Sequence, residues 1–345
     1  MLEWGIFLLV FFLYVHIIYQ YKSSDEMDIY EMDYVDNPNL QETCNLLQPF
    51  VFSSRESLPL LPTLEEALSE KADAQIHLYD DPKKDPISFP LSATIPLLCG
   101  SATKHRYYSE HNQEFIQEVA DFQDKMRESD PCLQPPFTIQ TTHDVCIGSQ
   151  FATTPLKYHV NTRKFLVVST GKIQVKMTPW KKHRKYIHEI RDYEVGCGEY
   201  RSGIDVWDPA LNHQRDCKKL EFLEFDVAEG QVLYIPPYWG YSLRYSESNT
   251  CIFDFTYSTW FNRIAFFGEI GRSWLQQQNT YKKTHRSLPS SVSEVILDKE
   301  VVTHSPDTID NIIPEVETNI EVPQISINDS VLGERCSPTQ GPLVP

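Results

Sequence analysis

The sequence is poor in basic residues for a chain of 345 residues. Its 31 lysines and arginines stand against 48 aspartates and glutamates, which gives a formal net charge of −17. A general nucleic-acid binder needs a basic face that neutralises phosphates, so the composition argues against nucleic acid as a partner. The run from Lys181 to Lys185 is a local exception. We interpret it as a solvated loop, with an anion or partner patch as the alternative.

Closely spaced cysteines are also missing. The eight cysteines are scattered, and they form neither a C-x-x-C pair nor a spacing typical of zinc sites. The sequence therefore gives no indication of a structural zinc site. An even number of cysteines permits disulfides without requiring them, which leaves the redox compartment open.

The N-terminus lacks the basic residues that begin a signal peptide, because the chain starts Met-Leu-Glu. Residues 4–19, WGIFLLVFFLYVHIIY, form a nearly unbroken apolar run. A membrane-spanning helix needs roughly 20 such residues, with a range of about 17–25. We therefore predict a transmembrane anchor over residues 1–22 of a single-pass membrane protein, with the membrane as a partner through residues 4–19. A signal peptide and a buried helix are the alternatives, and Lys22 alone leaves the orientation uncertain.

Three composition changes follow the apolar run. Residues 23–43 are acidic with almost no aliphatic periodicity, which predicts a solvated spacer. Residues 44–282 have the apolar content of a folded domain. Residues 283–345 are rich in serine, proline and acids, which predicts a disordered tail.

The predicted domain begins with helices and continues with strands. Thr63 precedes an acidic first turn, and a longer amphipathic helix is predicted over residues 112–128, where apolar residues recur at steps of three and four. From 137 to 261 short runs rich in valine, isoleucine and aromatic residues predict an antiparallel barrel or sandwich. The clearest of these runs are residues 165–169, 172–177, 222–227, 231–235 and 251–257.

Four segments carry a resemblance to a known family. They are Thr153 to His159 (TTPLKYH), Ser202 to Pro209 (SGIDVWDP), Gly230 to Tyr241 (GQVLYIPPYWGY) and Ile252 to Tyr257 (IFDFTY). In order and spacing they resemble the core of the JmjC-type, cupin-like 2-oxoglutarate oxygenases, including the degenerate copies found in large DNA viruses. The resemblance covers roughly residues 110–265. It implies a mainly β fold with a double-stranded β-helix (jelly-roll) core and flanking helices.

The metal ligands that the resemblance implies are largely replaced. The family's Thr-Pro-x-His-Tyr-Asp motif aligns Lys157 with the first histidine and His159 with the carboxylate, and Tyr241 stands at the last histidine. With an alignment one residue further on, the three positions are His159, Asn161 and Tyr241. An Fe(II) oxygenase site needs two imidazoles and a carboxylate on one face of the metal. Neither alignment supplies them, so we predict no metal site.

The cosubstrate site is altered as well. The resemblance implies a lysine two residues after Gly171 that would hold 2-oxoglutarate, and this position is Ile173. Thr154 resembles a cosubstrate-contacting threonine. Tyr238 and Trp239, which follow the Pro-Pro turn, are further candidates for lining a pocket.

These observations favour a catalytically inactive, membrane-anchored scaffold or binding module for an unknown protein or small molecule, without a cofactor. One alternative is an Fe(II)/2-oxoglutarate-dependent hydroxylase with an atypical site that His143 or Asp144 completes. Another is a sugar- or peptide-binding module in which Lys157, Thr154 and Tyr241 line a deep polar pocket.

Overall fold

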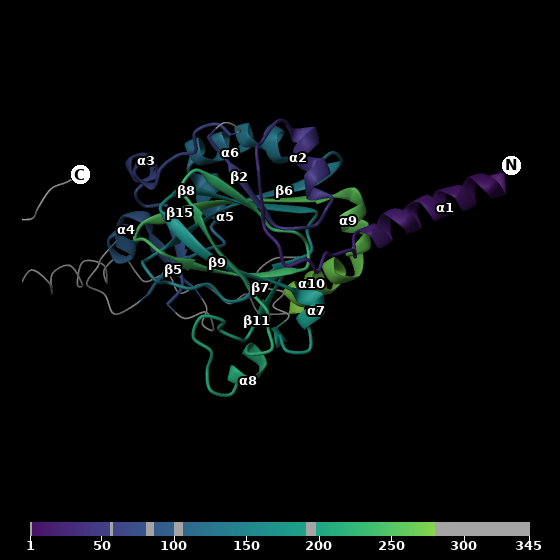
Figure 1. The fold of residues 1–345 in the computed structure, drawn as a ribbon. Helices are drawn as coiled ribbons and strands as arrows, with labels where there is room; N and C mark the ends of the chain where they lie inside the picture. The colour runs from purple at the N-terminus through teal and green to yellow at the C-terminus, as the bar shows by residue number, and fades with distance from the viewer. Residues whose placement is uncertain (1, 56–57, 81–85, 100–105, 191–197, 280–345) are drawn as a thin grey trace, which may run out of the picture. The chain divides into compact units, whose positions relative to one another are not determined.

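The computed structural model describes residues 2–55, 58–80, 86–99, 106–190 and 198–279 (Figure 1). A seven-stranded sheet has the order β1 (Tyr30–Met32), β2 (Phe50–Ser53), β13 (Gln231–Tyr234), β8 (Arg163–Thr170), β15 (Thr250–Thr259), β6 (Thr138–Gly148) and β5 (Tyr108–Ser109). A six-stranded sheet has the order β10 (Glu189–Ile190), β11 (Glu199–Ser202), β7 (Lys157–His159), β14 (Trp239–Tyr245), β9 (Lys172–Pro179) and β12 (Leu223–Ala228). A third sheet pairs β3 (Gln75–Leu78) with β4 (Ile87–Pro90).

The helices lie at the start of the chain, between β2 and β6, and after β15. Two short helices, α7 and α8, interrupt the strands. In chain order, the helices of the described residues are α1 (Leu2–Tyr19), α2 (Asn37–Cys44), α3 (Leu64–Glu70), α4 (Leu91–Cys99), α5 (Gln113–Glu118), α6 (Ala120–Leu133), α7 (Trp180–His183), α8 (Gln214–Cys217), α9 (Trp260–Ala265) and α10 (Phe267–Asn279).

From β6 onward the chain moves back and forth between the two large sheets. Strands β6, β8, β13 and β15 belong to the seven-stranded sheet, whereas β7, β9, β12 and β14 belong to the six-stranded sheet. Neighbours among these strands pair antiparallel. Leu166 of β8 and Val175 of β9 belong to one buried cluster, so the two sheets pack face to face.

The alternation of side chains explains both sheets. In β9, Ile173, Val175 and Met177 are buried, whereas Lys172 and Gln174 are partly exposed. Successive side chains of a strand point to opposite faces, so β9 has one core face and one solvent face. In the neighbouring sheet, β8 is buried from Arg163 to Val168 because helices cover its second face.

Helices α2, α5 and α6 cover that second face of the seven-stranded sheet (Figure 1). The apolar residues predicted to share one helix face, Phe115, Val119, Phe122 and Met126, are all buried against it. The predicted single helix is divided, because Val119 has an extended backbone with φ −103 and ψ 101. The predicted helix start at Thr63 is confirmed by a capping box with Glu66 at the N-terminus of α3.

The prediction of a mainly β fold is wrong. Helices and strands take up about equal shares of the described residues. The difference arises because the seven-stranded sheet is covered by helices on the face turned away from the six-stranded sheet, and because α1 and α10 add further helical residues.

The predicted transmembrane anchor and single-pass membrane localisation are also contradicted. Among the described residues, no helix is both long and apolar enough to cross a membrane. The helix α1 has 18 residues. At ~1.5 Å per residue it is shorter than the ~30 Å hydrocarbon core of a bilayer. It also carries Glu3 in its first turn and His16 in its last. Phe261 of α9 packs against Phe12 and His16 of α1.

The acidic segment 23–43 takes part in the fold. It contributes β1, which pairs in parallel with β2, and most of α2, in which Leu40 is fully buried. The predicted disordered tail, residues 283–345, lies outside the described residues.

Candidate functional site

Strands β7 and β14 bring the predicted metal-site positions together between the sheets. Lys157 and Tyr241 are directly paired residues of these strands, and His159 lies two residues further along β7. All three side chains are buried. The Lys157 ammonium lies 5.6 Å from the centre of the Tyr241 ring. The candidate site is therefore in the interior of the two-sheet core.

Lys157 is paired with carboxylates rather than exposed. Its Nζ atom lies 2.5 Å from Oε2 of Glu110, which follows β5, and 3.3 Å from Oε1 of Glu199 on β11. Glu110 also accepts a hydrogen bond of 3.2 Å from Nη2 of Arg201. Two cations therefore hold the Glu110 carboxylate, whose side chain is 2% exposed.

A second lysine extends the ion pairs into the seven-stranded sheet. Nζ of Lys164 on β8 donates to Oδ2 of Asp254 on β15 and lies 3.7 Å from Oε2 of Glu199. The Tyr241 hydroxyl donates to the same Oε2 atom at 3.4 Å. We call these charged residues the interior ion network, and its members are Glu110, Lys157, Lys164, Glu199, Arg201 and Asp254.

Burial and pairing act in opposite directions on the pKa values in this network. Burial alone would raise the pKa of Glu110, but Lys157 and neighbouring cations lower it to about 2. Burial would lower the pKa of Lys157, but Glu110 and then Glu199 raise it well above the usual value. Buried charges are tolerated only when they are paired, so the network is charged as a unit.

His111 and Asp144 lie at the edge of the network. The imidazole Nε2 of His111 is 3.6 Å from Glu199 Oε1, and its side chain is 20% exposed. Its backbone is left-handed, with φ 64. The Asp144 carboxylate accepts the His111 and Asn112 amides at 2.7 and 2.6 Å, which holds this turn. Burial raises the pKa of Asp144 to about 6.

His159 and Asn161 are occupied by other contacts. The ring nitrogen Nε2 of His159 lies 2.9 Å from the Ile235 carbonyl, so it carries the proton. Burial, followed by repulsion from Lys164, lowers the pKa of His159 to about 3. The side-chain oxygen of Asn161 accepts a hydrogen bond from Ser258.

The predicted pocket residues occupy packed positions. Thr154 is held to β14, because its hydroxyl accepts the Leu243 amide at 2.9 Å. Ile173 and Trp239 are fully buried in the cluster between the sheets. Tyr238 belongs to a different cluster, and the Lys181 ammonium lies 3.9 Å from the centre of its ring.

Of the two residues considered for completing a metal site, neither joins the lysines. His143 lies 2.9 Å from Asp130 of α6, on the helix-covered side of the sheet. Asp144 is used by the turn at His111.

The residues present do not fit an iron centre. Among the described residues, no group of three or more His, Cys, Asp and Glu side chains could hold a metal ion. At the first ligand position, Lys157 places a buried ammonium between two carboxylates. A divalent cation would meet this ammonium and that of Lys164 within the same network. The charges repel, so the site disfavours a metal.

Sequence reasoning missed most members of the network. A signal was present for one of them, because Asp254 interrupts the apolar run of β15, whereas Lys164 directly follows Arg163 at the start of β8. Charged residues are rarely buried unless they are paired, so the interruption at Asp254 indicates a buried ion pair. Glu110, Glu199 and Arg201 lie in short strands or turns without a comparable pattern.

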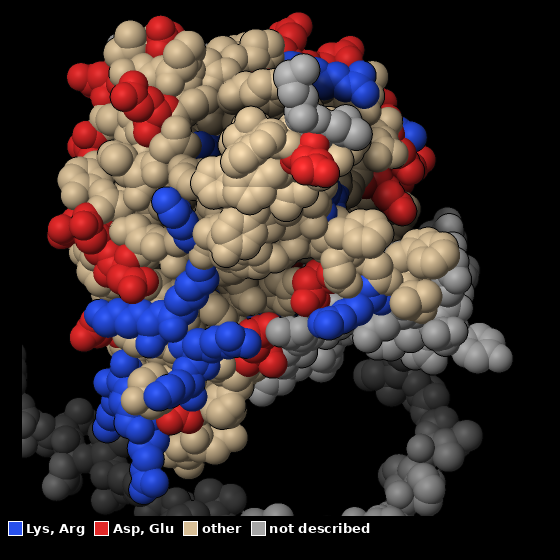
Figure 2. Space-filling model, turned by 90° about the vertical axis from the view of Figure 1, so that its right-hand side faces the viewer, with Lys and Arg blue, Asp and Glu red and all other residues tan. Residues whose placement is uncertain are grey.

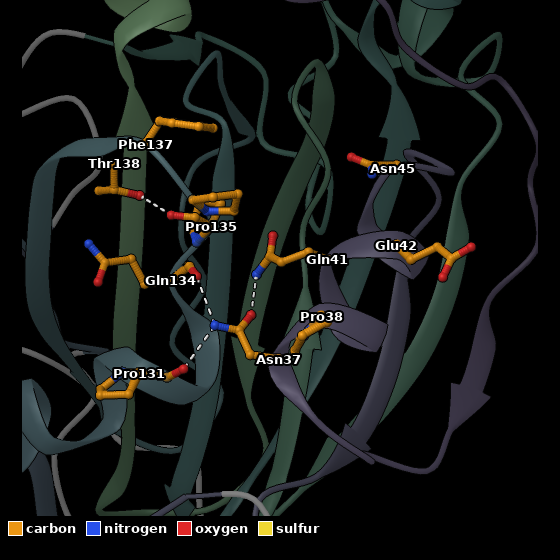
Figure 3. A pocket seen from close by; sticks show the side chains of 11 residues that line it. Asn37, Pro38, Gln41, Glu42, Asn45, Pro131, Gln134, Pro135, Phe137 and Thr138 are labelled. Carbon is orange, nitrogen blue, oxygen red and sulfur yellow. Dashed lines mark hydrogen bonds between the residues drawn. The ribbon is translucent and has the colours of Figure 1, made fainter.

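A groove of about 730 Å³ lies elsewhere, between α2 and the segment from α6 to β6 (Figure 3). Its walls carry four prolines and several amides. The Asn37 amide donates to the carbonyls of Pro131 and Gln134. Of the lining residues only Glu42 can ionise at ordinary pH, so the groove offers little catalytic chemistry. The lining residues are Asn37, Pro38, Gln41, Glu42, Asn45, Pro131, Gln134, Pro135, Pro136, Phe137 and Thr138.

The surface charges are unevenly distributed. Figure 2 shows Lys and Arg side chains gathered in one part of its face, whereas Asp and Glu are spread more widely. The basic run that begins with Lys181 forms α7 and the turn after it, and Lys182, Arg184 and Lys185 are exposed. His183 is buried and hydrogen-bonded to Thr178.

Comparison with known proteins assigns the chain to no family. No protein-family model matches the chain, and no curated protein matches it significantly.

Proposed function

We propose that the chain contains a JmjC-like, cupin-like domain that does not catalyse an iron-dependent oxidation and instead acts as a scaffold that binds a partner protein. The strand order supports the relationship, because β6 to β9 and β12 to β15 are shared between the two large sheets and pair antiparallel with one another. The four segments that resemble the family lie in or next to β7, β11, β14 and β15.

The interior ion network is the observation that carries this proposal. It stands where the family resemblance implies a metal, and it links both sheets through Lys157, Lys164 and Glu199. A bound cation would ordinarily hold the carboxylates of such an interior together. Here the lysine ammonium groups supply the positive charge, so the core can persist without the metal.

The filled interior favours a scaffold over a sugar- or peptide-binding pocket. Thr154, Lys157 and Tyr241 are each at most 5% exposed. The network's ionised side chains are engaged with one another through ion pairs in the interior. A partner would therefore contact the outer surface of the domain, since ligand sites are concave and accessible.

Anaerobic calorimetry of the full chain with Fe(II) and 2-oxoglutarate tests the proposal. We expect no saturable, metal-dependent binding of 2-oxoglutarate up to about 1 mM, where a binding free energy of only about −4 kcal/mol would still be detected. No succinate should form in air. Circular dichroism establishes that the same sample is folded.

The variant Tyr241→Phe is the matched control, because it removes the hydroxyl that bonds Glu199 and keeps the ring. It should behave like the unchanged chain. Micromolar, metal-dependent binding of 2-oxoglutarate, or succinate formation by either protein, would overturn the proposal and establish an oxygenase.

A further inference from the structure

Arg244 has an unusual environment on the outer face of the six-stranded sheet. It lies on β14 with its side chain turned away from the interior, since its neighbours Leu243 and Tyr245 are buried. Its guanidinium carbon lies 5.3 Å from the centre of the Phe151 ring and 5.6 Å from that of the Trp207 ring. The cation is therefore in contact with two aromatic rings.

Other contacts hold the Trp207 ring and the Phe151 backbone in place. The Trp207 indole nitrogen donates to the Ser242 hydroxyl at 2.8 Å, which fixes the ring against β14. The Phe151 amide donates to the Tyr245 carbonyl at 2.7 Å. Phe151 has a left-handed backbone with φ 64, which is rare for a bulky residue, and its side chain is 43% exposed. The Phe151 ring is thus partly exposed and lies beside Arg244.

Two other cations of this sheet face are paired with acids, whereas Arg244 has no acid partner among the described residues. Lys172 lies 2.6 Å from Asp226, and Lys176 lies 3.1 Å from Glu224. Arg244 stands opposite the neutral Gln174 in the sheet. Within the described part of the chain, its guanidinium makes no ion pair and no hydrogen bond.

A guanidinium carries five N–H donors in a planar fork that fits a carboxylate or phosphate with two parallel hydrogen bonds. A guanidinium attracted to the faces of aromatic rings keeps N–H donors available for a further partner. Lys176, whose ammonium lies 4.7 Å from the Trp207 ring centre, adds positive charge nearby. Arg106, 6.0 Å from the Phe151 ring centre, is a further cation near this ring.

We propose that Arg244, with Phe151 and Trp207, forms a binding site for an oxyanion, namely a carboxylate or phosphate group of a ligand or partner. Arg244 donates the two hydrogen bonds, the rings fix its plane, and the exposed edge of Phe151 contacts the apolar part next to the anion. The site lies on the face of β14 opposite Tyr241 and does not depend on whether the interior binds a metal.

Binding is tested by isothermal titration of the full chain with two probes, inorganic phosphate and a tri-glutamate peptide, at low ionic strength. The probe that binds more tightly identifies the oxyanion. Arg244→Gln should weaken that binding at least about tenfold, because a charge-assisted bidentate contact is worth roughly 1.5–3 kcal/mol. Arg244→Lys keeps the charge but loses the planar fork, and it should also weaken binding by about fivefold or more.

Arg272→Gln is the matched control. Arg272 is an exposed arginine of α10 whose removal changes the net charge equally. It should leave the affinity within about twofold, since exposed charges away from the site contribute little. Equal weakening by Arg244→Gln and Arg272→Gln would assign the binding to net charge and overturn the proposal. So would the absence of saturable binding of both probes to a folded chain.

Discussion

The Lys157 ammonium lies 2.5 Å from the Glu110 carboxylate, although the two residues are 47 positions apart in the chain. Lys157 belongs to the six-stranded sheet, and Glu110 directly follows the edge strand of the seven-stranded sheet. Their ion pair therefore joins the two sheets inside the core. Because both side chains are almost fully buried, each depends on the other for its charge.

Removing one partner of this pair should be costly. Lys157→Met leaves the Glu110 carboxylate with less compensation, and we expect the free energy of unfolding to fall by about 3–5 kcal/mol. Urea denaturation followed by circular dichroism measures the change. The double variant Lys157→Met, Glu110→Gln should lose less free energy of unfolding than the two single variants together, because the uncompensated charge is gone.

Lys71→Met is the matched control for this experiment. Lys71 also forms an ion pair, with Glu118 at 3.1 Å, but its side chain is 46% exposed. Exposed pairs contribute about 0–1 kcal/mol, so this variant should stay close to the unchanged chain. A loss for Lys157→Met as small as that for Lys71→Met would contradict the role assigned to the network.

The stability of the chain should depend on pH through His159. Its pKa is about 3 in the fold and about 6.5 in an unfolded chain, since burial and then Lys164 disfavour the charged ring. The folded state thus binds fewer protons. The contribution of His159 to the free energy of unfolding is fully present above pH 6.5 and is lost as the pH falls toward 3. At pH 5 the loss is about 2 kcal/mol.

Urea denaturation between pH 7 and pH 5, compared with a His159→Gln variant, measures this contribution. Glutamine can still donate to the Ile235 carbonyl but does not ionise. The comparison is needed because the raised pKa of Asp144, about 6, acts with the opposite sign in the same range. Equal pH dependence in both proteins would show that His159 is not neutral in the fold.

The strands could be predicted from the sequence because their signal is local. The predicted runs 165–169, 172–177, 231–235 and 251–257 coincide with β8, β9, β13 and β15 within a few residues. The run in β9 alternates and the other three are mostly apolar, as strands with one and with two buried faces require. The predicted helix over 112–128 was divided at Val119, where packing against the sheet overrides the helical period.

The balance of helix and strand and the role of α1 could not be predicted in the same way. Residues 4–19 are apolar enough to suggest a membrane span, but no helix among the described residues is both long and apolar enough to cross a membrane. The partners of Lys157 could not be predicted from the sequence either. Its partners Glu110 and Glu199 are distant in the chain, and only the folded strands bring them together.

Buried thiols should be protected from alkylation in the folded chain. Burial raises the pKa of Cys44 and of Cys251 to about 12 and that of Cys146 well above the usual value, whereas Cys132 is only half buried. The thiolate is the reactive form, so iodoacetamide should modify Cys132 before these three buried thiols. Protection of the other three by at least about a hundredfold corresponds to an opening free energy of about 3 kcal/mol.

Peptide mass spectrometry after a short native reaction measures this order, and the same reaction in urea provides the reference in which all four react. Labelling of Cys146 as fast as Cys132 would contradict the packing between the sheets.

Gly148, at the end of β6, provides a test of that packing. A Cβ atom added there would lie 2.2 Å from the Tyr245 ring, which is itself fully buried. Gly148→Ala should therefore force the ring to move and lower the free energy of unfolding by about 1–3 kcal/mol. In contrast, Gly271 of α10 has nothing within 4 Å of an added Cβ.

Gly271→Ala should be neutral or stabilise the chain by up to about 1 kcal/mol, because alanine loses less conformational entropy in a helix than glycine. Urea denaturation of both variants provides the comparison. Combining Gly148→Ala with Tyr245→Ala should cost less than the sum of the single changes, since the second change removes the ring with which the first collides. If the losses of free energy of unfolding in the two single variants add up to that of the double variant, the loss in Gly148→Ala does not arise from the contact between β6 and β14.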